Sequence, residues 1–124
     1  MREAHTGMDL IEFREFCLSL GGVAEKTPFG RFARRYDSIL AFYVADHMFC
    51  FTDIEDFTYV NVRSTPETID RLKEHYDSVS RPINRSLRYW IQLDFDGDVP
   101  DDEIRRLVRE AYDIVKAKYT KRTN

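Results

Sequence analysis

The chain lacks any apolar run long enough to cross a membrane, and its first residues lack the apolar core of a secretion signal. It has only two cysteines, Cys17 and Cys50, which lie far apart and in no CxxC pattern. Such a pair is typical of two buried, reduced thiols, with a single disulfide as the alternative. Together these features predict a cytoplasmic protein that does not bind a membrane.

Catalytic and metal-binding motifs are also missing. The sequence has no glycine-rich phosphate loop, no GxSxG elbow and no HExxH pair, and its histidines do not cluster with cysteines or acids. The acids of 94–98 resemble the start of a calcium loop, but Val99 and Arg105 occupy the positions that need Gly and Glu. We attribute these acids to a turn and a helix cap. We therefore expect no enzyme activity, no metal and no cofactor.

The chain does contain enough apolar material for one folded domain. Of its 124 residues, 43% are hydrophobic and 14% are aromatic, so it can fill a core without disulfides. We expect a single domain over 8–122, preceded by a short, polar and disordered tail at 1–7.

The stretch 38–63 predicts a meander of three antiparallel strands. Runs rich in β-branched and aromatic residues cover 39–45, 48–52 and 58–63. Asp46-His47 is expected to form the first turn, since Asp tolerates positive φ. Side chains alternate between the two faces of a strand. One face is expected to collect Leu40, Phe42, Val44, Phe49 and Phe51. The third strand should bury Val60 and Val62 and turn Tyr59, Asn61 and Arg63 to the other side.

Helical periodicity predicts three helices that cover this sheet. They lie near 9–20, 66–76 and 100–119. Asp9 with Glu12 forms a capping-box pattern, and Pro66 suits the first position of a helix. A further strand within 80–95 extends the sheet, whereas 23–37 is interpreted as a connector. The fold class is therefore α+β, with an antiparallel sheet packed against an N-terminal, a middle and a C-terminal helix.

Two windows of the sequence combine arginine with aromatic residues and contain no acid. They are predicted to bind nucleic acid through Arg31, Arg34, Arg35, Arg81, Arg85, Arg88, Tyr89 and Trp90. Guanidinium groups bind phosphate in bidentate geometry, and aromatic rings stack on exposed bases. If the fold brings both windows to one side of the sheet, they form one positive patch despite the net charge of −3. Alternatively, Trp90 belongs to the core and the arginines pair with Glu55, Asp56, Asp94 or Asp98.

Several short motifs together resemble the MmcQ/YjbR family. They are 11–20 with Gly22-Val23, Pro28-Phe29-Gly30, Met48-Phe49, Val60-Asn61-Val62 with Pro66-Glu67, Tyr89-Trp90, Val99-Pro100-Asp101, Ala111-Tyr112 and 115–118. The resemblance spans roughly 8–122. It implies an antiparallel sheet packed on helices, similar to frataxin-like proteins, and DNA binding through a double-wing surface of strands and loops.

The chain departs from the pattern of this family at two places. Members commonly carry a His-x-Asn-Lys segment before the tryptophan, where this chain has 84–88 with arginine and no histidine. Many members also have Ser-Tyr where this chain has Ala111-Tyr112. A role that depends on the histidine of the family is therefore not expected here.

These features lead to two functional hypotheses. The first is a non-enzymatic, cytoplasmic DNA-binding protein, monomeric, that uses the arginine windows on phosphates. The second is a module without nucleic acid, which binds a protein or a small ligand in a groove near Trp90.

Overall fold

The structure, a computed structural model, describes residues 8–27, 38–80 and 89–120. Its elements in chain order are α1 (Leu10–Leu18), β1 (Val23–Lys26), β2 (Ile39–Val44), β3 (His47–Asp53), β4 (Tyr59–Arg63), α2 (Pro66–His75), β5 (Trp90–Asp94) and α3 (Asp101–Tyr119). The predicted α+β class is confirmed.

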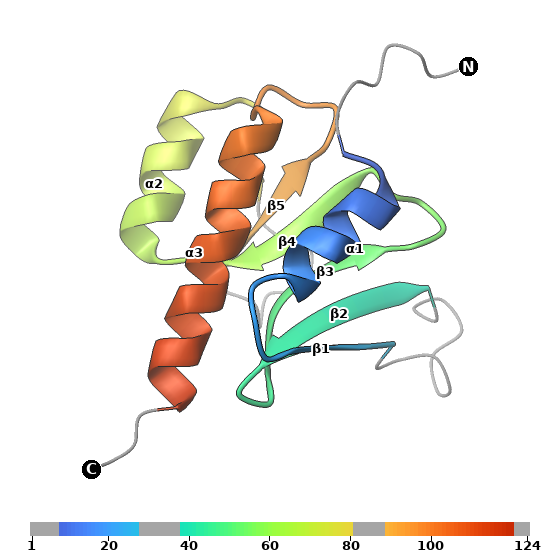
Figure 1. The fold of residues 1–124 in the computed structure, drawn as a ribbon. Coiled ribbons are helices and arrows are strands. Elements are labelled where there is room, and N and C mark those ends of the chain that lie inside the picture. Colours follow the sequence, from blue (N-terminus) through green and yellow to red (C-terminus); the bar gives the residue numbers. More distant parts are fainter. Residues whose placement is uncertain (1–7, 28–37, 81–88, 121–124) are drawn as a thin grey trace.

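The five strands form one antiparallel sheet in the order β1-β2-β3-β4-β5. In Figure 1, α3 lies between α1 and α2 and crosses in front of the strands. Apolar side chains of all three helices belong to the same core as one face of the sheet. We call this face the inner face and the opposite one the outer face. Hydrophobic burial against the inner face is the main stabilising contribution to the fold.

On the inner face of the sheet, the core contains a row of paired residues that crosses four strands. Phe42, Cys50, Val62 and Ile91 are neighbours in the strand register, and each is fully buried. The ring of Phe13 on α1 packs edge-on against Phe42, with the ring centroids 5.9 Å apart. The alternation predicted for β4 is confirmed, because Val60 and Val62 enter this core.

A β-bulge in β3 overturns one prediction about the faces. Phe42 pairs with Cys50 but Tyr43 pairs with Met48, so Phe49 is an additional residue. The bulge lets Phe49 and Cys50 both enter the core, and this resets the alternation along the strand. Phe51 therefore lies on the outer face, not beside Phe49 as the simple period of two predicted.

The turn between β2 and β3 lies one residue earlier than predicted. Val44 pairs with His47, so the two turn residues are Ala45 and Asp46, with φ angles of 53° and 66°. Two consecutive positive φ angles are typical of the two-residue turn that suits the twist of a hairpin. His47 belongs to β3, and its ring stacks on Tyr119 of α3 at 3.4 Å between centroids.

The interpretation of 23–37 as a connector was wrong for its first residues. Val23–Lys26 forms β1, which pairs with β2 at the edge of the sheet. Gly21 and Gly22 have φ angles of 100° and 67°, and this conformation lets the chain reverse after α1. Glu25 then receives hydrogen bonds from Arg14, with 2.7 Å between Nε and Oε1. The rest of the predicted connector, from 28, lies outside the described residues.

The predicted helices are confirmed, with small differences at their ends. Asp9 caps α1, accepting a hydrogen bond from the N–H of Glu12 at 2.8 Å, while Glu12 reciprocates. Thr65 caps α2, and Pro66 occupies its first turn. Among the described residues, no helix has both the length and the apolar composition that a membrane span requires.

Candidate functional site

The six arginines of the two windows lie outside the described residues, and so does Phe29. The structure does describe where these segments join the sheet. The first leaves after Thr27 and returns at Ser38, between β1 and β2. The second leaves after Ser80, which pairs with Gln92, and returns at Tyr89 beside β5. The attachment points therefore lie at opposite edges of the sheet. Ser38 and Tyr89 also lie at opposite ends of the strands, since Ile39 pairs with Asp53 whereas Trp90 pairs with Arg63.

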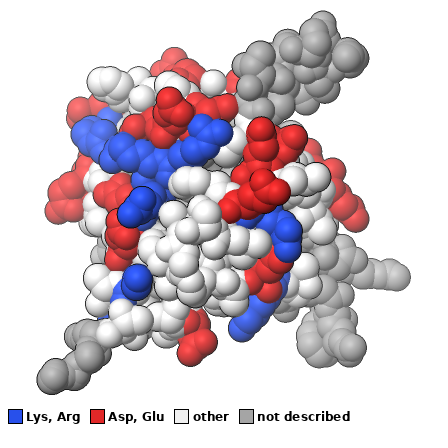
Figure 2. Space-filling model, viewed as in Figure 1, with Lys and Arg blue, Asp and Glu red and all other residues white. Residues whose placement is uncertain are grey.

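The charges of the chain are strongly segregated between its parts. The described residues contain 10 of the 19 Lys and Arg but 20 of the 22 Asp and Glu. Figure 2 shows that, on the helical side, cationic groups over α2 and α3 are interspersed with acids. Two of these cations are paired within α3, Arg105 with Asp102 at 3.1 Å and Arg106 with Glu103. The helical side is therefore poorly suited to a polyanion.

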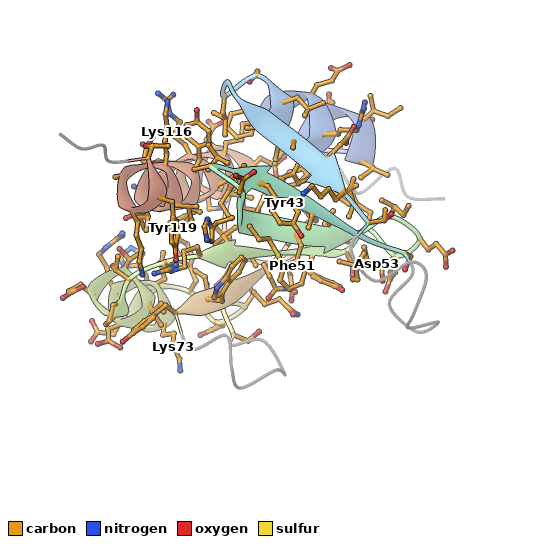
Figure 3. All side chains as sticks on the ribbon, turned by 90° about the horizontal axis from the view of Figure 1, so that it is seen from below. Tyr43, Phe51, Asp53, Lys73, Lys116 and Tyr119 are labelled. Carbon is orange, nitrogen blue, oxygen red and sulfur yellow. The ribbon has the colours of Figure 1, made fainter. Side chains whose placement is uncertain are left out.

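The outer face carries a set of aromatic and cationic side chains. We call this set the outer-face cluster: Lys26, Tyr43, Phe51, Asn61, Arg63, Tyr89 and Trp90. In Figure 3, Tyr43 and Phe51 lie over the middle of the sheet and Asp53 lies toward one end. In the described part of the chain no helix packs on this face, since the helices share the core of the inner face. Within the described residues, the cluster thus lies on the face of the sheet that no helix covers.

Cations of the cluster lie over aromatic rings. The Nζ atom of Lys26 is 4.7 Å from the centroid of the Tyr43 ring, and the Cζ atom of Arg63 is 5.9 Å from that of Tyr89. These are cation–π distances, which hold the charges above a flat apolar surface. Burial raises the pKa of Tyr43, so its hydroxyl stays protonated at neutral pH.

The two aromatic residues predicted for the site differ in exposure. Tyr89 is 39% exposed, whereas Trp90 is only 8% exposed. The Trp90 ring lies on the outer face and packs against Phe51, with 5.6 Å between the ring centroids. Most of the Trp90 side chain is therefore buried beneath the outer-face cluster, and little of it is exposed to solvent. Phe51 is half-buried and was not predicted to belong here, because the bulge in β3 is not visible in the sequence.

Polar atoms without partners mark the middle of the cluster. The Oδ1 atom of Asn61 and the Nε atom of Arg63 are buried, and within the described part of the chain neither has a hydrogen-bond partner. Asn61 is 2% exposed and is paired in the register with Phe51 on one side and Gln92 on the other. Buried polar groups are nearly always hydrogen-bonded, so unpaired ones call for an explanation. One signal of this is visible in the sequence, an asparagine between two valines that are predicted to be buried.

The opposite end of the sheet is acidic. Thr58, Asp94, Asp96 and Gly97 line a shallow depression of about 240 Å³. Burial raises the pKa of Tyr59, and the charges of Asp53 and Asp56 raise it further. Within the described residues, no three His, Cys, Asp or Glu side chains are grouped as metal ligands. Among the described residues, these acids make this end of the sheet negatively charged.

The Asp98 carboxylate forms hydrogen bonds with the two residues that follow the C-cap of α2. It accepts hydrogen bonds from the backbone N–H groups of Asp77 and Ser78 and from the Ser78 hydroxyl, at 2.7, 3.1 and 2.6 Å. The Ser78 hydroxyl and these N–H groups lower the pKa of Asp98. A Cβ atom on Gly97 would lie 2.4 Å from the Ser78 hydroxyl oxygen, so the turn requires glycine. This supports the interpretation of 94–98 as a turn. The predicted helix cap was wrong, because the N-cap residue of α3 is Pro100 and no side chain caps this helix.

Cys17 and Cys50 are free and fully buried, with their sulfur atoms 3.9 Å apart. Burial raises the pKa of Cys50 well above its usual value. The thiolate is the reactive form of cysteine, so burial and this raised pKa make Cys50 poorly suited to act as a nucleophile.

Comparison with known proteins agrees with this architecture. The chain is similar to the crystal structure of DR2400 from Deinococcus radiodurans, which has a DUF419 domain: the TM-score is 0.79 at 23% identity, over 91% of this chain and 82% of that one. It is also similar to a protein from Pseudomonas syringae, with a TM-score of 0.64 at 14% identity, over 87% of this chain and 99% of that one. None of the curated proteins matches. The YjbR family model matches residues 18–114, and the chain therefore belongs to the YjbR family.

Proposed function

We propose that this protein binds DNA, without catalysing a reaction, through the outer face of its sheet and the arginine windows at its two edges. The observation that carries the proposal is the outer-face cluster, where Lys26 and Arg63 lie over aromatic rings. Both windows join the sheet at strands that border this face. A ligand on the outer face would therefore lie between the two sources of positive charge.

The charge distribution supports the arginine windows as the source of phosphate contacts. The described residues have ten more acids than bases, so their long-range field does not attract DNA. Six arginines, Arg31, Arg34, Arg35, Arg81, Arg85 and Arg88, lie in windows without acids. Tyr89 and Trp90 follow the second window directly and connect it to the cluster. Contacts of this kind fix position on the backbone and carry little sequence information.

A salt titration of DNA binding tests this proposal. Fluorescence anisotropy with labelled oligonucleotides should show an affinity that falls steeply as salt rises, because bound phosphates release counterions. Replacing Arg85 and Arg88 by Ala should reduce the slope of log affinity against log salt for duplex DNA by nearly two, since each lost phosphate contact removes about 0.9.

The matched control is a double variant on the helical side, with Arg105 and Arg106 replaced by Ala. Both guanidinium groups pair with acids of α3, so the salt slope should not change. The proposal fails if no binding occurs at low salt, or if the Arg85 and Arg88 variant binds like the wild type.

A second candidate function is a module that binds a small ligand or a protein beside Trp90. The buried ring of Trp90 and the unpaired atoms of Asn61 and Arg63 favour it, as does the acidic character of the described chain. Such binding would be insensitive to salt and to the loss of Arg85 and Arg88, so the same titration separates the two candidates.

We also infer a cytoplasmic location for either function. The two thiols are free although their sulfur atoms lie 3.9 Å apart, and this arrangement suits a reducing compartment.

A further inference from the structure

We propose that Asn61 and Arg63 hold one unpaired base of single-stranded DNA on the outer face. This inference rests on the proposed function, to which it adds a preference for single strands and a named recognition site. It starts from the Oδ1 atom of Asn61 and the Nε atom of Arg63, which are buried and have no hydrogen-bond partner within the described residues. A fold that keeps a buried amide oxygen without a hydrogen-bond donor loses stability, so a ligand that supplies the donor gives a reason to keep it.

The strand register places the groups that a base requires around Asn61. Phe51 on β3 and Gln92 on β5 are its direct cross-strand neighbours. Arg63 lies two residues along β4, on the same face, and pairs with Trp90. Amide and guanidinium groups form hydrogen bonds with base edges, and aromatic rings stack on base faces. The outer face thus combines both kinds of contact within three neighbouring strands, β3, β4 and β5.

The shape of the surface favours a single strand over a duplex. The Asn61 side chain lies at the level of the strands and is 2% exposed, so only a base separated from its neighbours can bring an edge to it. In a duplex the bases are stacked and their edges are recessed in the grooves. Sheet surfaces with aromatic rings bind unstacked bases in several families of single-strand-binding domains.

Binding at this point should disturb the contact between Phe51 and Trp90. Phe51 is half-buried and is the cross-strand neighbour of Asn61, so we expect a base bound at the amide to contact the Phe51 ring and displace it. The Phe51 and Trp90 ring centroids are 5.6 Å apart. Trp90 is the one tryptophan of the chain, so its intrinsic fluorescence reports on this site and on no other.

The experiment compares single-stranded oligonucleotides with duplexes of the same length, using anisotropy of a label and fluorescence of Trp90. The wild type should bind the single strand more tightly than the duplex and should change its Trp90 emission only with the single strand. Asn61→Leu, which keeps the size of the side chain, should weaken single-strand binding by about tenfold and abolish the emission change. Duplex binding should not change.

Thermal unfolding of Asn61→Leu separates a ligand role from a structural one. If Asn61 is kept for a ligand, removing its unpaired buried atom should leave the melting temperature unchanged or raise it. If Asn61→Leu fails to fold, Asn61 has a structural role and the inference is overturned for that residue. Arg63→Lys then provides the second test, because it keeps the charge but removes the Nε donor. It should lower the single-strand preference without changing the salt slope.

The outcomes distinguish this inference from the function on which it rests. If single strand and duplex bind equally in the wild type, and Asn61→Leu and Arg63→Lys alter neither, the base site is wrong while DNA binding stands. If neither DNA form binds at low salt, the proposed function itself is wrong. Loss of single-strand preference in a folded Asn61→Leu protein supports both.

Discussion

The two residues of the β2–β3 turn have a backbone conformation that costs free energy. Ala45 and Asp46 have φ angles of 53° and 66°, in the left-handed region that a Cβ atom disfavours. Asp can form local hydrogen bonds that offset part of this cost, but Ala cannot. The turn is retained because it closes the pairing of Val44 with His47.

We predict that Ala45→Gly stabilises the protein. Glycine adopts positive φ without steric cost, while its extra freedom in the unfolded chain offsets part of the gain, so the net effect should be about 0.5–1 kcal/mol. The midpoint of urea unfolding measures it. Ala24→Gly is the matched control, because Ala24 lies in extended strand β1 and glycine should destabilise it there. A lower midpoint for Ala45→Gly would show that the turn has a different conformation.

At the scale of elements, signals from residues close together in the chain correctly predicted where helices begin. Asp9 and Pro66 mark the starts of α1 and α2 correctly, because capping depends on residues close in the chain. The bulge at Phe49 and the short strand Val23–Lys26 were missed, because each exists through pairing with β2. Neither has an apolar period that would reveal it, and Gly21-Gly22 before β1 is equally typical of a simple helix end.

The candidate site was predictable to a similar extent. Its aromatic residues Tyr89 and Trp90 were predicted from composition, but the importance of Asn61 depends on Phe51 and Gln92, which reach it across neighbouring strands. The arginine windows stay a prediction, because they lie outside the described residues. Long-range register is thus the information that the sequence did not provide.

The edge strand β1 is joined to α1 by the ion pair of Arg14 and Glu25. Hydrogen bonds from Arg14 lower the pKa of Glu25 below its usual value of 4.5. A carboxyl with a lowered folded pKa contributes stability above its unfolded pKa and loses it as the pH falls through the folded pKa. The contribution of this pair should therefore be complete at pH 7 and should disappear in acid.

We predict that Glu25→Gln is less stable than the wild type at pH 7 and equally stable at a pH below the lowered pKa of Glu25. The effect should be small, because the pair is partly exposed and screened by solvent. Urea unfolding of both proteins across the acid range measures it. Arg14→Gln is the control and should lose the same pH-dependent contribution to the free energy of unfolding. A difference that is constant with pH would mean that Glu25 acts through packing and not through its charge.

At the scale of the whole molecule, charge and burial divide the chain into distinct parts. The described elements share one core with Cys17 and Cys50 at its centre, between α1 and β3. The same elements carry most of the acids, whereas nearly half of the cations lie in the remaining segments. An acidic, well-packed body with cationic segments would bind a polyanion only through those segments.

The buried thiols allow a test of how cooperatively this body unfolds. Neither sulfur is accessible, and burial raises the pKa of Cys50, so a thiol reagent should label the native protein only through opening of the core. We predict that both cysteines are labelled at one common rate. Phe13→Ala, which removes a ring that contacts Phe42 and Phe95, should cost about 3–5 kcal/mol and accelerate labelling more than about 100-fold.

The control is Ile11→Ala, because the Ile11 side chain is 66% exposed and should leave the labelling rate unchanged. Mass spectrometry of partly labelled protein distinguishes the outcomes, since a common opening yields molecules with no label or two labels. If Cys17 is labelled much faster than Cys50, then α1 opens while the sheet stays folded, and the core is not one cooperative unit. In that case the outer face, which is built on the same strands, would remain intact when α1 opens, and DNA binding would persist.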